Sequence, residues 1–148
     1  MDFSFVDGEG VLSILKKELV KCERIYFAIA FLKSSGLALI KESLVKHVRL
    51  KGRQNLEIII GTSDFYITEP QALKSLIRIA DVRGVNNKGF HPKIFCLEYK
   101  QKFILIVGSS NLSAPALGSG NIEANIVIKG MKNESTIYKE TIDFFLSS

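Results

Sequence analysis

Residues 90 to 125, FHPKIFCLEYKQKFILIVGSSNLSAPALGSGNIEAN, decide the fold of this chain. We expect a strand over 91–98, in which His91 and Lys93 share one face because alternate side chains of a strand point the same way. A short turn then leads to a second strand over 103–107. All of its residues are apolar, which is typical of a strand buried on both faces.

The segment GSSN at 108–111 ends the second strand. We expect a short helix over 112–117, whose start would expose backbone N–H groups that attract anions. A third strand is predicted over 121–128, with Glu123 as a single acid among apolar neighbours. A carboxylate in such a place is costly without a partner. A histidine is the natural partner, because a carboxylate fixes the ring tautomer and stabilises the cation.

Together this stretch offers an imidazole, an ammonium, a hydroxyl, an amide and a carboxylate from His91, Lys93, Ser109, Asn111 and Glu123. Such a group is typical of a phosphate cradle that holds a nucleophile or an acid and base. The plainer alternatives are a half-buried histidine, a solvated lysine, and turn or helix-cap roles for the serine and the asparagine. Capping and phosphate binding are compatible with each other.

The pattern His91-Pro92-Lys93, then GSSN at 108–111, then Glu123 resembles the HxK, GSxN and E signature of the phospholipase D superfamily. The surrounding residues are most similar to the nuclease branch that includes metal-independent restriction endonucleases. Members of the family usually carry an aspartate five residues after the lysine, where this chain has Glu98. That carboxylate either supports the site from behind or is simply solvated.

The resemblance implies an α/β fold with a mixed, mostly parallel sheet and helices on both faces. It implies catalytic roles for His91, Lys93, Asn111 and Glu123, with Ser109, the lysine and the asparagine binding the substrate phosphate. Family members use two HxK motifs, one histidine attacking phosphorus and the other protonating the leaving group. This chain has one motif, so we expect a homodimer that shares one active site.

Length and charge fit this interpretation. A chain of 148 residues is expected to form one domain, 1–148, with a sizeable core. Its 20 Lys and Arg against 15 Asp and Glu give a net charge of +5, which favours an anionic partner such as nucleic acid, with DNA ranked above RNA.

Neither a metal nor a cofactor is expected, because the histidines and cysteines lack the spacing of metal ligands. Cys22 and Cys96 lie in apolar surroundings, which indicates buried free thiols in a reducing compartment. No signal peptide and no apolar run of ~20 residues is present, so we expect a cytoplasmic protein without a membrane partner.

The remaining elements alternate in type, which predicts parallel pairing. We expect helices over 11–22, 37–47, 70–80 and 134–146, and strands over 24–32, 56–60 and 81–85. His47 lies among basic residues at a helix end, where solvation is favoured over a DNA contact. The loop 62–68 is a candidate substrate wall, in which Phe65 or Tyr66 would either stack on a base or belong to the core.

Three functions therefore compete. The first is a metal-independent nuclease that acts through a phosphohistidine, as the resemblance implies. The second is a phospholipase D-type phosphatidyl hydrolase or transferase, which ranks lower because the sequence has no exposed apolar helix or lipid anchor. The third is a non-catalytic nucleic-acid-binding module of the same fold, against which the intact set of His91, Lys93, Asn111 and Glu123 argues.

Overall fold

Seven strands and four helices make up the part of the chain that the computed structural model describes, residues 1–64 and 67–147. The strands are β1 (Asp2–Val6), β2 (Arg24–Ile29), β3 (Leu56–Gly61), β4 (Asp81–Val85), β5 (Lys93–Glu98), β6 (Lys102–Gly108) and β7 (Asn125–Met131). The helices are α1 (Gly8–Glu18), α2 (Ser34–Lys51), α3 (Pro70–Ile77) and α4 (Thr136–Ser147), with short 3-10 turns at Arg53–Asn55 and Lys132–Glu134.

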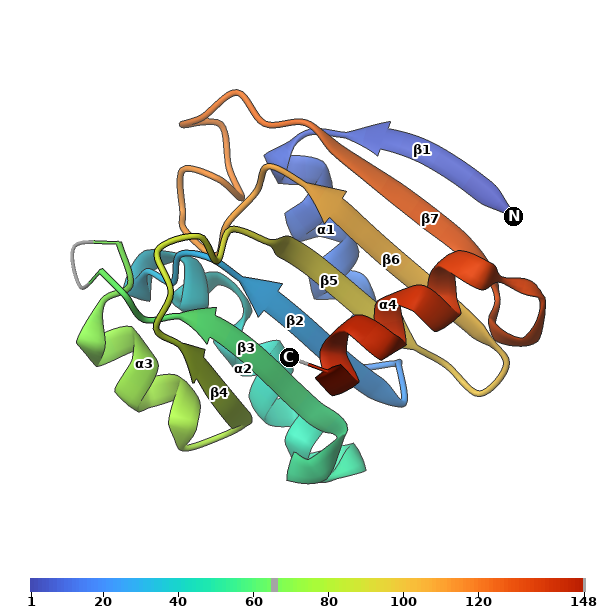
Figure 1. Cartoon of the computed structure of the whole chain (residues 1–148), viewed down its shortest axis with the longest axis horizontal. Coiled ribbons are helices and arrows are strands. Elements are labelled where there is room, and N and C mark those ends of the chain that lie inside the picture. The colour runs from blue at the N-terminus through green and yellow to red at the C-terminus, as the bar shows by residue number, and fades with distance from the viewer. Residues whose placement is uncertain (65–66, 148) are drawn as a thin grey trace.

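The strands form one sheet in the order β1-β7-β6-β5-β2-β3-β4 (Figure 1). The predicted mixed α/β sheet with helices on both faces is confirmed, but the expectation of mostly parallel pairing is wrong. Only β2 with β3 and β3 with β4 are parallel, and the other four pairings are antiparallel. β5 and β6 are joined by the turn 99–101, which is far too short for a parallel crossover.

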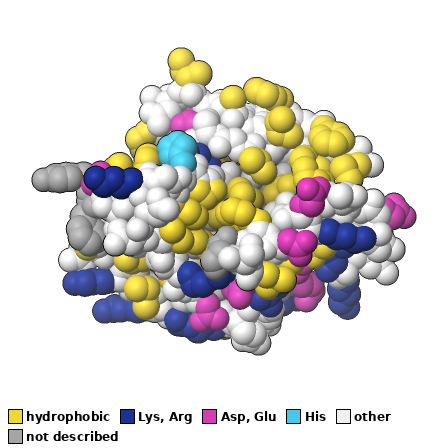
Figure 2. Space-filling model, viewed as in Figure 1, with side chains coloured by type: hydrophobic (Ala, Val, Ile, Leu, Met, Phe, Trp, Pro, Cys, Tyr) yellow, Lys and Arg dark blue, Asp and Glu magenta, His cyan; other side chains and the backbone are white. Residues whose placement is uncertain are grey.

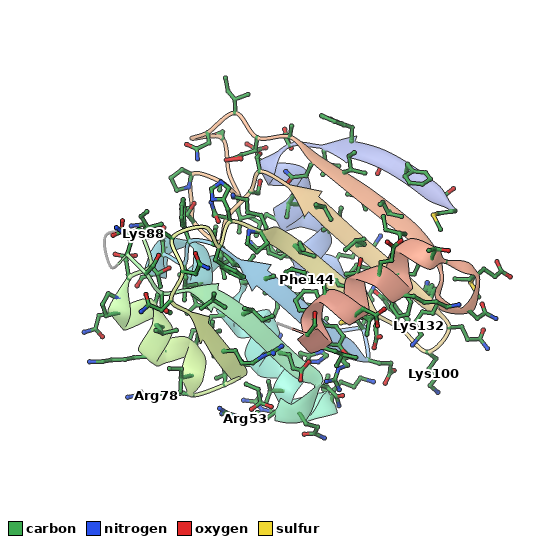
Figure 3. All side chains as sticks on the ribbon, in the orientation of Figure 1. Arg53, Arg78, Lys88, Lys100, Lys132 and Phe144 are labelled. Atoms are coloured by element: carbon green, nitrogen blue, oxygen red, sulfur yellow. The ribbon has the colours of Figure 1, made fainter. Side chains whose placement is uncertain are left out.

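The helices divide unequally between the two faces of the sheet. α1, α2 and α3 cover one face, where the side chains of Phe27, Phe95 and Leu44 are fully buried in the larger core. α4 alone crosses the other face (Figure 1), and its Phe145 packs on a smaller cluster that includes Tyr26. Phe144, labelled in Figure 3, packs against the same cluster. One face is therefore covered by three helices and the other by a single helix.

Two elements of the predicted site segment differ from expectation. Residues 112–117 form a single turn and no helix, because Leu112 is held in a parallel bridge with Leu32 and its C=O accepts from the Lys33 N–H at 3.0 Å. Glu123 lies in the loop before β7 and not within a strand. The strand begins only at the buried Asn125.

Asn125 fixes this start by binding the loop that follows β6. Its Oδ1 accepts from the Ser110 N–H at 3.3 Å, and its Nδ2 donates to the Ser110 Oγ at 3.0 Å. Gly108 is needed beside it, because a Cβ there would lie 2.4 Å from the Ala124 O and from the Asn125 Oδ1. The ends of β6 and β7 are thereby locked together at the place where the candidate residues lie.

The interpretation of His47 as solvated is also wrong, since its side chain is fully buried. The ring lies between two carbonyl oxygens, with Nδ1 3.0 Å from the Leu19 O and Nε2 3.3 Å from the Asn55 O. Burial lowers its pKa. The prediction for the cysteines is confirmed: Cys22 and Cys96 are buried and free, and burial raises the pKa of each thiol to about 12.

Candidate active site

His91 and Lys93 lie at the start of β5, at the edge of the sheet where β2 and β3 end. The strand begins two residues later than predicted, at Lys93, so His91 precedes it and is exposed. The Lys93 Nζ donates to the backbone O of His91 at 2.9 Å. Both side chains approach Phe31, with the His91 ring centroid 5.7 Å from that of Phe31 and the Lys93 Nζ 5.8 Å from it.

Phe31 also connects this pair to Asn111. The backbone N–H of Phe31 donates to the Asn111 Oδ1 at 3.0 Å. The carbonyl of the amide is thus occupied, and within the described residues no partner contacts its NH2 group. The structure therefore brings together His91, Lys93 and Asn111, as the sequence predicts, around a phenylalanine that the sequence analysis did not single out.

Ser109 and Glu123 form the other side of the site. The Ser109 Oγ donates to the Glu123 Oε2 at 2.5 Å and accepts from the Ala124 N–H at 3.0 Å. The Asn121 Nδ2 donates to the Glu123 Oε1 at 3.3 Å. The expected partnership of Glu123 with a histidine of the same chain is not formed among the described residues. The carboxylate is satisfied instead by the serine hydroxyl and the amide.

Lys93 and Glu123 are coupled electrostatically across the site. Partial burial lowers the pKa of Lys93, and the negative charge of Glu123 acts in the opposite direction and raises it. The burial removes part of the hydration of the Lys93 ammonium, and the carboxylate of Glu123 favours that charged form. A desolvated cation binds an anion more strongly than a fully hydrated one, because the local dielectric is lower.

Glu98 lies apart from these residues, which argues against the expectation that its carboxylate supports the site from behind. Glu98 ends β5, whereas His91 precedes the start of the strand. Because a strand rises by ~3.3 Å per residue, the two residues lie roughly 20 Å apart. The Glu98 carboxylate accepts a hydrogen bond from the Tyr138 O–H of α4. The role of Glu98 is to hold α4 against the sheet.

A cavity of about 500 Å³ opens beside His91. Its described lining residues are Phe31, Ser63, Asp64, Ile67, Lys88, Phe90 and His91. This volume lies within the range of small-molecule sites, roughly 300–1,000 Å³. Ser63, Asp64 and Ile67 of the loop 62–68 line this cavity, and the role of the loop as a substrate wall stays a prediction. The proposed stacking residues Phe65 and Tyr66 lie outside the described residues.

The described residues contain neither a cluster of metal ligands nor a helix that could span a membrane. No three His, Cys, Asp or Glu side chains in the ranges 1–64 and 67–147 come close enough together to hold a metal ion. No helix within those ranges is long and apolar enough to cross a membrane.

The sheet order and the division of the helices give a fold that is similar to that of phospholipase D family members of known structure. No family model matches the chain, and no curated protein matches its sequence. The fold is similar to that of Nuc, a phospholipase D family member from Salmonella typhimurium, with a TM-score of 0.70 and 14% identity over 99% of this chain and 91% of that one.

Two other solved structures share the fold. NucT from Helicobacter pylori has a TM-score of 0.68 and 14% identity, over 99% of this chain and 95% of that one. TrmBL2, an archaeal chromatin protein with a novel mode of DNA binding, has a TM-score of 0.55 and 15% identity over 99% of this chain and 53% of that one. At these identities the likeness establishes the fold.

Proposed function

We propose that this protein is a metal-independent phosphodiesterase that hydrolyses nucleic acid, with DNA favoured over RNA, through a covalent phosphohistidine. One observation carries the proposal: His91, Lys93 and Asn111 converge on Phe31, with the Ser109–Glu123 pair completing the rim. An exposed imidazole beside a desolvated ammonium and free amide donors is suited to attack on a phosphodiester. No cluster of metal ligands accompanies it in the described residues.

In the first step a ring nitrogen of His91 attacks phosphorus and forms an N–P bond, while the bond to the leaving oxygen breaks. The leaving oxygen takes a proton from a second, protonated histidine. Water then attacks the phosphohistidine and gives its proton to that second histidine, and the N–P bond breaks. Lys93 and the NH2 group of Asn111 stabilise the negative charge that develops on the phosphoryl oxygens. The negative charge of Glu123 favours the ammonium form of the lysine, and Ser109 holds the carboxylate in place.

The second histidine must come from another copy of the chain. A single His91 cannot attack and protonate in the same step, and His47 is buried in the core. We therefore propose a homodimer in which the partner subunit's His91 faces this one across a two-fold axis. The interface lies on the side of β5 and of the 108–117 loop, away from the basic end of α2.

The charges at the end of α2 support this placement. Three of its cations have acidic partners, with N···O distances of 3.5 Å for Lys46–Glu42, 3.1 Å for Lys51–Glu23 and 3.2 Å for Arg53–Asp81. Figure 3 shows Arg53 at the lower side of the molecule, apart from Lys88 at the upper left. These three cations already have acidic partners, whereas Lys88 lines the cavity beside His91.

The cavity is suited to the nucleoside next to the scissile phosphate. Phe31 and Phe90 offer ring surfaces on which a base stacks, and Lys88 offers a charge for a neighbouring phosphate. The net charge of +5 and the DNA-binding neighbour TrmBL2 favour nucleic acid over a phospholipid. We take residues 1–148 as one domain that acts in the cytoplasm.

Cleavage in the presence of excess chelator tests this function. Labelled single- and double-stranded DNA, RNA and a phosphatidylcholine vesicle are incubated separately with the protein and EDTA. We expect DNA to be cut, and we expect a ³²P-labelled DNA substrate to leave label on the quenched protein. Activity that requires magnesium would overturn the mechanism, and cleavage of the lipid alone would favour a phosphatidyl hydrolase. Binding of nucleic acid without any turnover would indicate a non-catalytic module.

A further inference from the structure

The positive charge of this chain is concentrated in one segment. Residues 11–53, which run from α1 through β2 and α2, contain ten Lys and Arg against three Asp and Glu. The whole chain contains 20 Lys and Arg and 15 Asp and Glu, so the remaining residues contain ten cations and twelve anions. The excess behind the net charge of +5 therefore comes from this one segment.

Two hollows on α1 and α2 bring part of this charge together. One, of about 510 Å³, lies between the two helices, and the other, of about 580 Å³, lies along α2. Both are lined by Ala38, Glu42 and Lys46, so they are continuous, and we call them together the helical groove.

The helical groove lies on the face of the sheet away from α4. Figure 1 shows α1 and α2 behind the sheet. On the α4 side, which Figure 2 shows, apolar side chains fill the middle of the surface and Lys and Arg lie mainly toward its lower edge. The two faces therefore differ in charge as well as in the number of helices that cover them.

The cations of the groove are available to a partner. Lys16, Lys41 and Arg49 are exposed, and none of the three forms a salt bridge within the described part of the chain. Lys46 is paired with Glu42 at 3.5 Å, but the two lie one turn apart on the surface of α2, where such a pair contributes little. Carboxylates of a partner can therefore bind here without displacing a strong ion pair.

Apolar side chains lie between these cations. Val20, Leu39 and Val45 line the groove and are half-buried. Lys41, Val45 and Arg49 follow one another at intervals of four residues, so they form one row along α2, with the apolar side chain between two cations. The groove thus combines an apolar floor with a cationic rim.

We infer that the helical groove is the docking site of a partner protein that binds through an acidic amphipathic helix. Such a helix lays its apolar face into a groove between helices. Its apolar side chains lie on Val20, Leu39 and Val45, and its carboxylates pair with Lys41 and Arg49 on the rim. The charge of the groove is complementary to that of the partner, and such complementarity supplies specificity and fast association. The inference is independent of the proposed function.

Nucleic acid fits this groove less well. Within the described residues no aromatic side chain lines it, so it offers no ring on which a base stacks. Its far end is also remote from the candidate site. α2 begins at Ser34, next to Lys33, whose N–H donates to the Leu112 O in the loop after β6. At 1.5 Å per residue, Arg49 lies roughly 22 Å further along the helix.

Selection from a peptide library tests the docking site. A peptide of about 16 residues forms a helix of about 24 Å, which matches the length of α2. A phage library of such helical peptides, with random charged, polar and apolar positions, is selected on the wild-type protein. We expect the selected peptides to carry an excess of Asp and Glu, with apolar residues at helical spacing. A synthetic copy of a selected peptide is then titrated by fluorescence anisotropy.

Variants of the groove and a matched control locate the binding. The double variant Lys41→Glu/Arg49→Glu should weaken binding by at least ~10-fold, because it reverses the charge of the rim. Val45→Ser should weaken it by ~3-fold through the lost apolar contact. Lys139→Glu is the matched control, since Lys139 is an exposed lysine on α4, and it should leave the affinity unchanged. Circular dichroism checks that each variant is folded.

Selected peptides without an acidic excess would overturn the inference. Equal binding by the Lys41→Glu/Arg49→Glu protein, or by a scrambled peptide of the same composition, would do so too. Failure to select any peptide would also overturn it. If that protein then lost affinity for anionic vesicles or, in a His91→Asn background, for duplex DNA, the groove would be assigned to lipid or to nucleic acid. Peptide binding is measured without catalysis, so the result stands whether or not the proposed nuclease activity is found.

Discussion

The two faces of the sheet differ in how completely they are covered. On the face of α1, α2 and α3, side chains from three helices and the strands bury one another, and this face also contains the buried histidine, His47. On the face of α4, a single helix leaves the side chains of Phe3, Phe5 and Ile126 exposed. The exposed histidine, His91, lies at the edge beside this second face.

The face covered by α1, α2 and α3 mainly stabilises the fold, and the other face adjoins the residues proposed to act on a substrate. Burial of a large aliphatic side chain contributes about 1.5–3 kcal/mol, so the covered face holds the fold together. The open face offers little such stabilisation at Phe3 and Phe5, and it adjoins the residues that can meet a substrate. Variants of the first face should change the free energy of unfolding, and variants at the second should change activity or association.

The largest expected effect compares the two histidines. His91→Asn removes the proposed nucleophile, so turnover of a phosphodiester reporter should fall by at least ~10³-fold while the melting temperature stays unchanged. His47→Asn should behave in the opposite way. It leaves a gap and a poorly satisfied carbonyl in the core, and should lower the free energy of unfolding by about 1–3 kcal/mol.

Reporter kinetics and thermal unfolding on both variants make this comparison. A His91→Asn protein with a near-normal rate would show that His91 has no chemical role. A His47→Asn protein that is fully stable but inactive would contradict the structural role given to His47.

The next effect concerns packing. Leu44→Ala on α2 empties space in a fully buried position and should cost about 2–5 kcal/mol in the free energy of unfolding. Phe5→Ala removes a larger side chain but one that is mostly exposed, so it should change the stability of the isolated subunit by less than about 1 kcal/mol. Urea unfolding of dilute protein, below the dissociation constant of any dimer, measures both. Equal losses would mean that the open face is packed as tightly as the covered one.

The smallest expected effect is a shift in pH dependence. Lys93 binds phosphate only as the ammonium, and burial lowers its pKa below the ordinary value of 10.5 while Glu123 raises it. Affinity for inorganic phosphate should therefore fall, as pH rises, at a pH below 10.5. In Glu123→Gln the raising influence is gone, so the midpoint should move to still lower pH.

Phosphate titrations by calorimetry between pH 8 and 11 locate the two midpoints. Glutamine keeps one oxygen that accepts from the Ser109 Oγ, but its NH2 group replaces the oxygen that accepts from the Asn121 Nδ2. The position of the midpoint is the readout, since the overall affinity also changes when a negative charge is removed. An unmoved midpoint would mean that Glu123 has no influence on Lys93.

Much of the fold is predictable from the sequence because its cues are local. The apolar strand over 103–107 and the alternation of strands and helices over residues 24–85 give the α/β class directly. The antiparallel pairing of β5, β6 and β7 differs from the expected mostly parallel sheet. The short turn at 99–101 indicates antiparallel pairing, because a parallel connection needs a much longer crossover. β1 was not predicted, since it is only five residues long and its partner β7 lies some 120 residues away.

The candidate site is predictable where spacing within one segment defines it. His91, Lys93 and Asn111 converge as expected, because a strand and the end of its neighbour carry them. Phe31 was missed because it follows an apolar strand and is indistinguishable there from a core residue. The expectation for Glu98 fails for a different reason. Its spacing from Lys93 resembles the family motif, but the intervening strand places Glu98 at the other end of β5.

The pairing of β1 with β7 also sets the order in which the molecule matures. Phe3 and Phe5 are synthesised some 120 residues before the strand with which they pair, residues 125–131. These two exposed phenylalanines therefore have no sheet to join while the residues between the two strands are being made. The β1–β7 edge of the sheet is completed only after His91, Lys93 and Glu123 are already in the chain.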